Sequence, residues 1–172
     1  MNLQKASINN KLELQKICKE SYSKVFANHW TGNGLELYLE EQFGNKRLEL
    51  ELINDDYEYF FIKKENKNIG FLKINFKTSD ELSDLENCEL EKIYILPEYS
   101  EMGIGKIAMT EIIKKVKQKS KMLFFLCVID TNKSAIAFYE KLGFKLHSKT
   151  RLEIPNFREE LKGMNRMYLK LD

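Results

Sequence analysis

The chain has 172 residues, 43% hydrophobic and 31% charged, a balance that fits one globular domain over residues 1–172 and excludes a disordered chain. The longest uncharged apolar run, Met122 to Ile129, is too short to cross a bilayer, and no apolar segment follows Met1–Lys5, so we expect a cytoplasmic protein without a membrane span or signal peptide. The net charge of +2 gives no support to a nucleic-acid partner.

The first third of the chain is expected to be mainly helical. A short strand near Leu3–Ser7 precedes three segments with helical spacing of apolar residues. They are a helix capped by Asn9 or Asn10 with apolar positions from Leu14 to Val25, a helix at Leu35–Phe43, and a helix capped by Asn45 that ends near Ile53.

The pattern then changes to that of strands. Tyr57–Ile62 has strand composition, Asn66–Asn68 predicts a turn, and apolar residues alternate with polar ones from Leu72 to Lys77. After the polar loop Thr78–Asn87 comes another strand, Cys88–Leu96. Because no helix separates these three strands, we expect them to pair antiparallel.

Two glycines stand between this strand and the next helix. Gly103 and Gly105 open an amphipathic helix whose apolar face runs from Ala108 to Val116. A glycine turn at a helix start exposes backbone N–H groups at the positive end of the helix dipole. The segment therefore favours phosphate binding.

The same glycines match other patterns. Gly103-x-Gly105-x-x-Ala108 fits the dinucleotide-binding fingerprint, with Asp130 at the place of the ribose-binding acid. Against that interpretation, Pro97–Met102 separate the strand from the glycines, and only 42 residues follow Asp130, too few for a Rossmann sheet. A Walker A loop is excluded, because no Ser or Thr follows a lysine at the required glycine spacing. A purely structural turn stays open.

The remaining elements complete a sheet. They are a buried strand at Met122–Ile129, a helix at about Ser134–Leu142 ending at Gly143, and closing strands at Phe144–Leu152 and Met164–Leu171. The crossover between Cys88–Leu96 and Met122–Ile129 predicts one right-handed β-α-β unit. The predicted fold class is α+β, with a mixed, mostly antiparallel central sheet of about seven strands flanked by helices.

Two segments carry a family resemblance. They are Ile93–Lys106, with the glycine turn, and Asn132–Phe144, with the pattern Asn-x6-Tyr-x3-Gly-Phe. Together they resemble the signature segments of the GNAT acyltransferases, which implies the acyl-CoA N-acyltransferase fold, acetyl-CoA as co-substrate and acetyl transfer to an amine. Three further segments resemble the bacterial branch that acetylates spermidine and spermine: Glu20–Phe26, Tyr38–Phe43 and Glu89–Ile95.

The resemblance also implies a coenzyme site. The usual loop is Gln/Arg-x-x-Gly-x-Gly/Ala, and this chain has both glycines but Ser100 at the first position. Loop N–H groups would hold the pyrophosphate, strand main chain would pair with the pantetheine arm, and the second segment would add side-chain contacts. The implied residues are Ile93, Tyr94, Ile95, Glu101, Met102, Gly103, Ile104, Gly105, Lys106, Asn132, Ser134 and Lys141.

Two residues are candidates for catalysis. By resemblance, Tyr139 lies near the thioester sulfur and protonates the departing thiolate, and a phenol keeps its proton at neutral pH. The alternative for Tyr139 is a core aromatic beside Phe138. Glu91 is the candidate base that deprotonates the amine, on a strand face expected to include Ile93 and Ile95. The alternative for Glu91 is a strand glutamate paired with a nearby lysine.

The expected acceptor is a small amine or polyamine. Residues 1–86 hold 12 Lys and Arg against 15 Asp and Glu, whereas residues 87–172 hold 16 against 11. This asymmetry suits a cationic acceptor and an anionic donor, although solvated helix faces explain it equally well. Carboxylates and aromatics in the acceptor region would suit a polyamine: Glu36, Glu40, Glu41, Asp55, Asp56, Phe26 and Trp30.

The sequence predicts no metal site. Cys18, Cys88 and Cys127 lack metal-ligand spacing, and each lies in an apolar stretch, so we expect buried, unreactive thiols. A non-catalytic module that binds coenzyme A or a dinucleotide remains the alternative to an enzyme. A homodimer also stays open, since the sequence does not reveal the oligomeric state.

Overall fold

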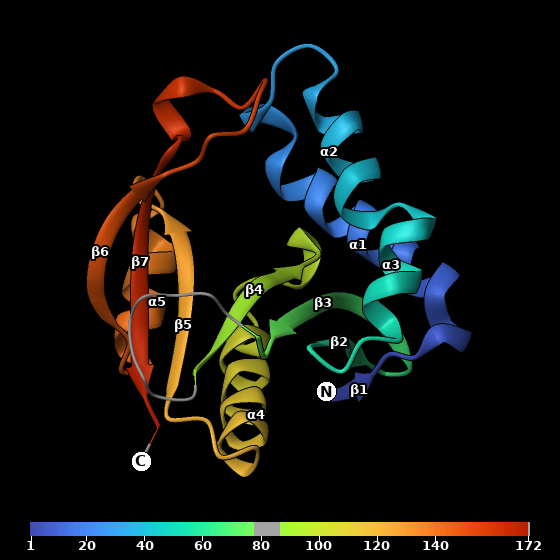
Figure 1. Cartoon of the computed structure of the whole chain (residues 1–172), viewed down its shortest axis with the longest axis vertical. Coiled ribbons are helices and arrows are strands. Elements are labelled where there is room, and N and C mark those ends of the chain that lie inside the picture. The colour runs from blue at the N-terminus through green and yellow to red at the C-terminus, as the bar shows by residue number, and fades with distance from the viewer. Residues whose placement is uncertain (78–86, 172) are drawn as a thin grey trace.

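The computed structural model describes residues 1–77 and 87–171. Within these residues, seven strands form one sheet in the order β1-β2-β3-β4-β5-β7-β6 (Figure 1). The strands are β1 (Asn2–Lys5), β2 (Tyr57–Lys64), β3 (Lys67–Asn75), β4 (Asn87–Ile95), β5 (Leu123–Ile129), β6 (Lys145–Arg151) and β7 (Gly163–Lys170). The helices are α1 (Lys11–Phe26), α2 (Gly34–Phe43), α3 (Asn45–Leu52), α4 (Ile104–Gln118) and α5 (Lys133–Lys141).

The strand pairing confirms the predicted fold class. β1 to β4 pair antiparallel in chain order, and β7 pairs antiparallel with both β5 and β6. Among the described strands, only β4 and β5 run parallel, and α4 connects them. A Rossmann sheet needs several such parallel units, so the dinucleotide-binding alternative is wrong.

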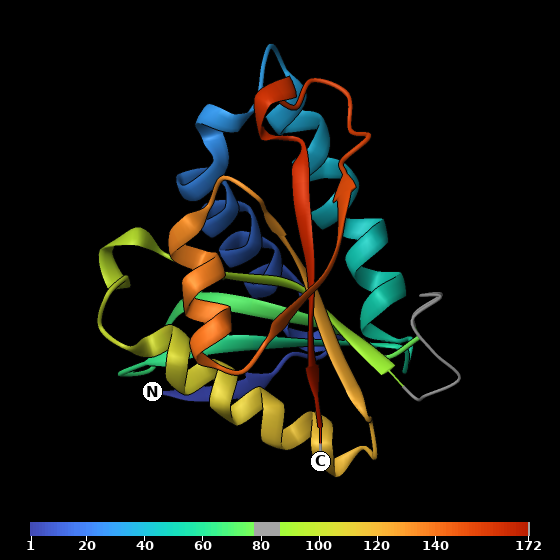
Figure 2. The same ribbon diagram turned by 90° about the vertical axis from the view of Figure 1, so that its left-hand side faces the viewer.

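The sheet separates two hydrophobic clusters. On β3, Leu72 and Ile74 face the cluster that includes α4 and α5, whereas Phe71 faces α1, α2 and α3. Figure 2 shows α4 and α5 next to each other on the first of these faces. A Cβ atom placed on Gly105 of α4 would lie 3.6 Å from the Phe138 ring of α5, so the start of α4 lies close to the middle of α5.

The parallel pair opens toward one end of the sheet. Asn87–Leu90 of β4 pairs with Leu123–Leu126 of β5, and the pairing ends there although both strands continue (Figure 1). The register between β3 and β4 also shifts, because Lys73 pairs with Lys92 whereas Ile74 pairs with Leu90. Glu91 is therefore the extra residue of a β-bulge, a feature that bends and twists a strand. The diverging ends frame the candidate site.

The element boundaries differ little from the prediction. Gly44, and not Asn45, is the N-cap of α3, and Asn45 is its first residue. Most of the polar loop predicted at Thr78–Asn87 lies outside the described residues, and Asn87 belongs to β4. No helix in residues 1–77 and 87–171 combines the length and apolar character needed to cross a bilayer.

Candidate active site

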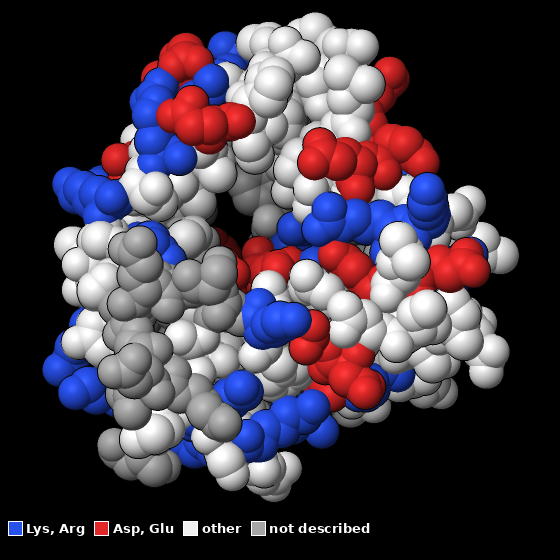
Figure 3. Space-filling model, viewed as in Figure 1, with Lys and Arg blue, Asp and Glu red and all other residues white. Residues whose placement is uncertain are grey.

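A pocket of about 400 Å³ lies where β4 and β5 separate. Figure 3 shows it as a hollow near the middle of this face, with atoms of both charge signs at its lower rim. The pocket lining includes Leu90–Ile95 of β4 and Leu126–Ile129 of β5, and the rings of Tyr22, Phe26 and Tyr38 form the opposite wall. Its volume is that of a small-molecule site.

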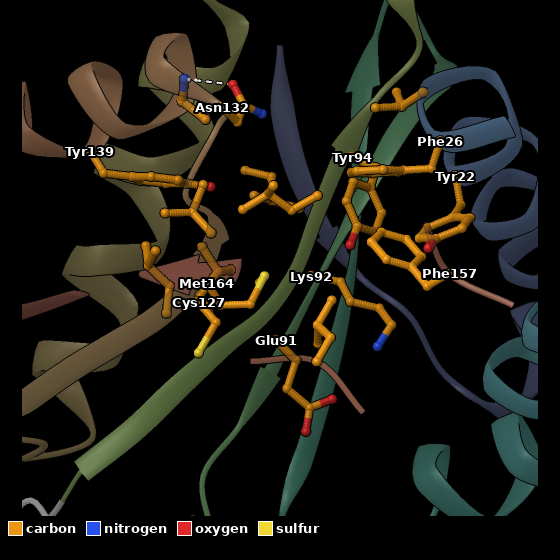
Figure 4. A pocket seen from close by; sticks show the side chains of 18 of the residues that line it. Tyr22, Phe26, Glu91, Lys92, Tyr94, Cys127, Asn132, Tyr139, Phe157 and Met164 are labelled. Carbon is orange, nitrogen blue, oxygen red and sulfur yellow. Dashed lines mark hydrogen bonds between the residues drawn. The ribbon is translucent and has the colours of Figure 1, made fainter. Parts of the chain in front are cut away.

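Tyr139 and Asn132 enter this pocket from the end of the sheet that α5 covers (Figure 4). Burial raises the pKa of Tyr139 to about 12, so its hydroxyl keeps a proton at neutral pH. Asn132 is the N-cap of α5, and its Oδ1 accepts a hydrogen bond of 3.1 Å from the N–H of Ala135. The side-chain NH₂ group of Asn132 makes no hydrogen bond to the described residues, so it is available as a donor to a ligand.

The bulge places Glu91 differently from the prediction. Leu90 and Ile93 both belong to the cluster beneath α4, so Glu91 and Lys92 between them face the α1–α3 side. The expected shared face with Ile93 and Ile95 is therefore wrong. Two consecutive residues point to one side because a bulge interrupts the period of two.

Glu91 is also held by a buried lysine. Its Oε2 lies 2.5 Å from Nζ of Lys73, which is 1% exposed, and its Oε1 accepts from Asn75 at 3.0 Å. Lys73 Nζ lies 2.8 Å from Glu51 Oε1 as well. Burial alone would raise the pKa of Glu51, but Lys73 outweighs it and holds that pKa below its usual value. The carboxylate of Glu91 is thus already part of an internal ion pair.

Glu89 is a candidate that the sequence analysis missed. Burial, together with the nearby charge of Glu91, raises the pKa of Glu89 to about 7. It lies one residue before the pocket-lining part of β4 and acts electrostatically on Cys127. Its carboxylate makes no ion pair or hydrogen bond with residues 1–77 and 87–171. A carboxyl group that titrates near neutral pH is suited to accept a proton.

The three cysteines differ in exposure. Cys18 and Cys88 are buried, as expected, whereas Cys127 is exposed in the pocket wall. The expectation for Cys127 is wrong, because the pairing of β4 with β5 ends at Leu126 and leaves the next residue of β5 uncovered on that side. Burial, followed by the charge of Glu89, nevertheless raises the pKa of Cys127 to about 11, so the thiol is poorly suited to act as an acyl carrier.

We expect Cys127 to be accessible but slow to react. In the native protein at pH 7, iodoacetamide should modify it slowly, and the rate should rise with pH toward about 11, because the thiolate is the nucleophile. Cys18 and Cys88 should stay unmodified until the protein unfolds. Mass spectrometry of alkylated peptides measures all three sites, and rapid labelling of Cys127 at neutral pH would contradict this expectation.

The glycine turn has the geometry expected for anion binding. Gly103 is the N-cap of α4 with φ of 73°, a left-handed conformation that favours glycine. The first N–H groups of α4 have no acceptor within the helix, and the helix dipole adds positive potential there. Ser100 donates its hydroxyl proton to the carbonyl of Pro97 at 2.6 Å, so its side chain closes the preceding turn.

Several predicted residues lie outside the pocket. Ser134 and Lys141 are exposed on α5 and do not line it. Of the predicted aromatics, Phe26 lines the pocket, whereas Trp30 is buried in the core. None of the carboxylates predicted for the acceptor region lines it, although Glu40 and Glu41 border a separate shallow depression. Those outside are Glu36, Glu40, Glu41, Asp55 and Asp56.

Comparisons with known proteins agree with this fold. Residues 17–144 match the model of the acetyltransferase (GNAT) family. The chain is 25% identical over 150 residues to spermidine N(1)-acetyltransferase of Thermoplasma acidophilum, covering 85% of this chain and 89% of the relative. The structure resembles PaiA N-acetyltransferase of T. acidophilum in complex with coenzyme A, with a TM-score of 0.76, 22% identity and 98% coverage of both chains.

Spermidine N-acetyltransferase of Vibrio cholerae, in complex with CoA and spermine, gives a TM-score of 0.68 at 15% identity, covering 99% of this chain and 95% of that one. The family match spans most of the chain, including the glycine turn and Tyr139. The chain therefore belongs to the GNAT family and is an acetyl-CoA-dependent N-acetyltransferase.

Proposed function

We propose that the protein transfers the acetyl group of acetyl-CoA directly to a small primary amine in the pocket between β4 and β5. The observation that carries this proposal is the end of β4–β5 pairing at Leu90, because it leaves a strand edge and a pocket side by side. The residues fit the coenzyme: the start of α4 offers N–H groups to a diphosphate, and Ile93 to Ile95 offer main chain to an extended arm.

In this proposal the chain contributes binding and proton transfer. Acetyl-CoA, when bound, supplies an activated acetyl thioester. Tyr139 holds at its hydroxyl the proton that the departing sulfur requires, since burial raises its pKa to about 12. Glu89, with a pKa of about 7, accepts a proton from the acceptor ammonium through water. The pocket walls hold the amine in place, which supplies much of the acceleration.

Glu89→Gln and Glu91→Gln form a matched pair that assigns the base. We expect wild-type kcat/KM to rise with pH through a midpoint near 7, because Glu89 must lose its proton before it can accept another. Glu89→Gln should remove this midpoint and leave only the ionisation of the acceptor amine. Glu91→Gln should keep a midpoint but move it to lower pH, because the charge of Glu91 that helps to raise the pKa of Glu89 is gone. If Glu91→Gln alone abolishes the midpoint, Glu91 is the base, as the sequence analysis predicted.

A polyamine is the acceptor class that the names of two relatives suggest, and the rings of Tyr22 and Phe26 suit an alkylammonium group through cation–π attraction. The charges support a polyamine less, because the carboxylates predicted for the acceptor region lie outside the pocket.

The direct test measures thiol release from acetyl-CoA with a panel of amines, peptides and polyamines. The proposal predicts amine-dependent release together with an acetylated product in the mass spectrum. Coenzyme A binding without thiol release for any acceptor would instead support a non-catalytic binding module.

A further inference from the structure

Lys92 is a pocket residue to which the proposed mechanism gives no role. It occupies the bulge of β4 beside Glu91 and lines the pocket, with its side chain directed toward α2 (Figure 4). Its polar contact among the described residues is a hydrogen bond of 3.1 Å to Oε1 of Gln42, and its Nζ lies 5.9 Å from the centre of the Phe43 ring. It is thus a partly buried cation without a carboxylate contact within residues 1–77 and 87–171.

The neighbouring carboxylates already form ion pairs with other cations. Glu51 accepts from Arg47 at 2.9 Å and from Lys73 at 2.8 Å, and Glu91 lies 2.5 Å from Lys73. These two cations and two carboxylates balance, which leaves Lys92 in excess. Glu89 interacts with Lys92 only by longer-range electrostatic attraction, without a contact. The pKa of Glu89, about 7, keeps its carboxyl group partly protonated at neutral pH.

A buried ammonium group without an ion-pair partner is costly. Burial accordingly lowers the pKa of Lys92 below its usual value, although the charges of Glu91 and Glu51 oppose this. An anionic group of a ligand in the pocket would provide the missing partner through a charge-assisted hydrogen bond. A second ammonium group of a polyamine would instead be repelled.

We propose that Lys92 recognises a carboxylate of the acceptor, so that the acetylated amine belongs to an amino acid or a related amino-carboxylate. This inference rests on the proposed function and names the acceptor class for the same pocket. The aromatic rings of Tyr22, Phe26 and Tyr38 contact the carbon skeleton, and Lys92 and the Tyr139 region lie on different sides of the pocket. The acceptor is therefore oriented with its carboxylate at Lys92 and its reacting amine toward Tyr139.

The test compares acceptors that differ by a carboxylate: 5-aminopentanoate against pentylamine, and L-lysine against cadaverine. Wild-type protein should show the higher kcat/KM for the carboxylated member of each pair. In Lys92→Met this preference should fall by about 10- to 100-fold, the loss expected for a charge-assisted hydrogen bond. In Lys92→Arg it should persist, and in Lys92→Glu it should reverse in favour of cadaverine and spermidine.

The readout is the ratio of kcat/KM for two acceptors. Partial misfolding of a variant lowers both values together and therefore does not change this ratio. Lys19→Met is the matched control, since Lys19 pairs with Glu40 at 3.0 Å away from the pocket and its loss should leave the ratio unchanged. A wild-type preference for cadaverine or spermidine, or an unchanged ratio in Lys92→Met, would overturn this inference alone. If no amine releases thiol in any variant, the proposed function itself fails.

Discussion

Replacement of Tyr139 by Phe is expected to lower kcat by about 10²–10⁴-fold, the usual contribution of a general acid. The substitution removes only the hydroxyl, whose pKa of about 12 marks it as a proton holder at neutral pH. The ring contacts to Phe138 and Phe144, at centroid distances of 5.2 and 5.8 Å, remain. Steady-state kinetics with a reactive amine measures the effect.

Coenzyme affinity separates this role from a structural one. Calorimetry with coenzyme A should give similar dissociation constants for wild type and Tyr139→Phe, because the hydroxyl is assigned to proton transfer. Tyr168→Phe on β7 is a matched control, since Tyr168 does not line the pocket. Unchanged turnover in Tyr139→Phe would remove Tyr139 from the role of acid.

Replacement of Lys73 by Met is expected to lower the free energy of unfolding by about 3–5 kcal/mol, the cost of leaving buried charges without their partner. Lys73 is 1% exposed and joins Glu51 on α3 to Glu91 on the β4 bulge, so its loss leaves the Glu91 carboxylate without its ion-pair partner and Glu51 with Arg47 alone. Urea denaturation measures the change. Adding Glu51→Gln and Glu91→Gln to Lys73→Met should recover part of the loss.

Lys77→Met is the control for Lys73→Met. Lys77 is 80% exposed and lies 3.9 Å from Asp56, so its removal should change stability by no more than about 0.5 kcal/mol. The pH dependence gives a second check. Lys73 holds the folded-state pKa of Glu51 below the ordinary value of 4.5, so this stabilisation is present at neutral pH and lost as the pH falls below that value. A loss under about 1 kcal/mol in Lys73→Met would contradict the ion-pair account.

The parts of the fold set by local patterns could be predicted. The two glycines before an amphipathic helix predicted the turn in which Gly103 has a positive φ. The uninterrupted strands before it predicted antiparallel pairing, and the crossover through α4 predicted one parallel pair. These features depend on hydrophobic period and turn chemistry, which neighbouring residues specify.

The parts that depend on contacts between residues far apart in the sequence could not be predicted. Cys127 was expected inside a sheet, and only the divergence of β4 from β5 exposes it. Alternation gave no sign that Lys73 is buried between Glu51 and Glu91. One signal for the bulge was present, because the apolar residues Leu90 and Ile93 are three positions apart, a spacing that a regular strand does not place on one face.

A crystal structure of the protein with coenzyme A tests the central claim most directly. The account predicts the diphosphate at the first N–H groups of α4, next to Gly103, and the pantetheine arm along Ile93–Ile95 in the opening beside β5. The sulfur should then lie within hydrogen-bonding reach of the Tyr139 hydroxyl. A diphosphate bound elsewhere, or a sulfur outside the pocket between β4 and β5, would contradict it.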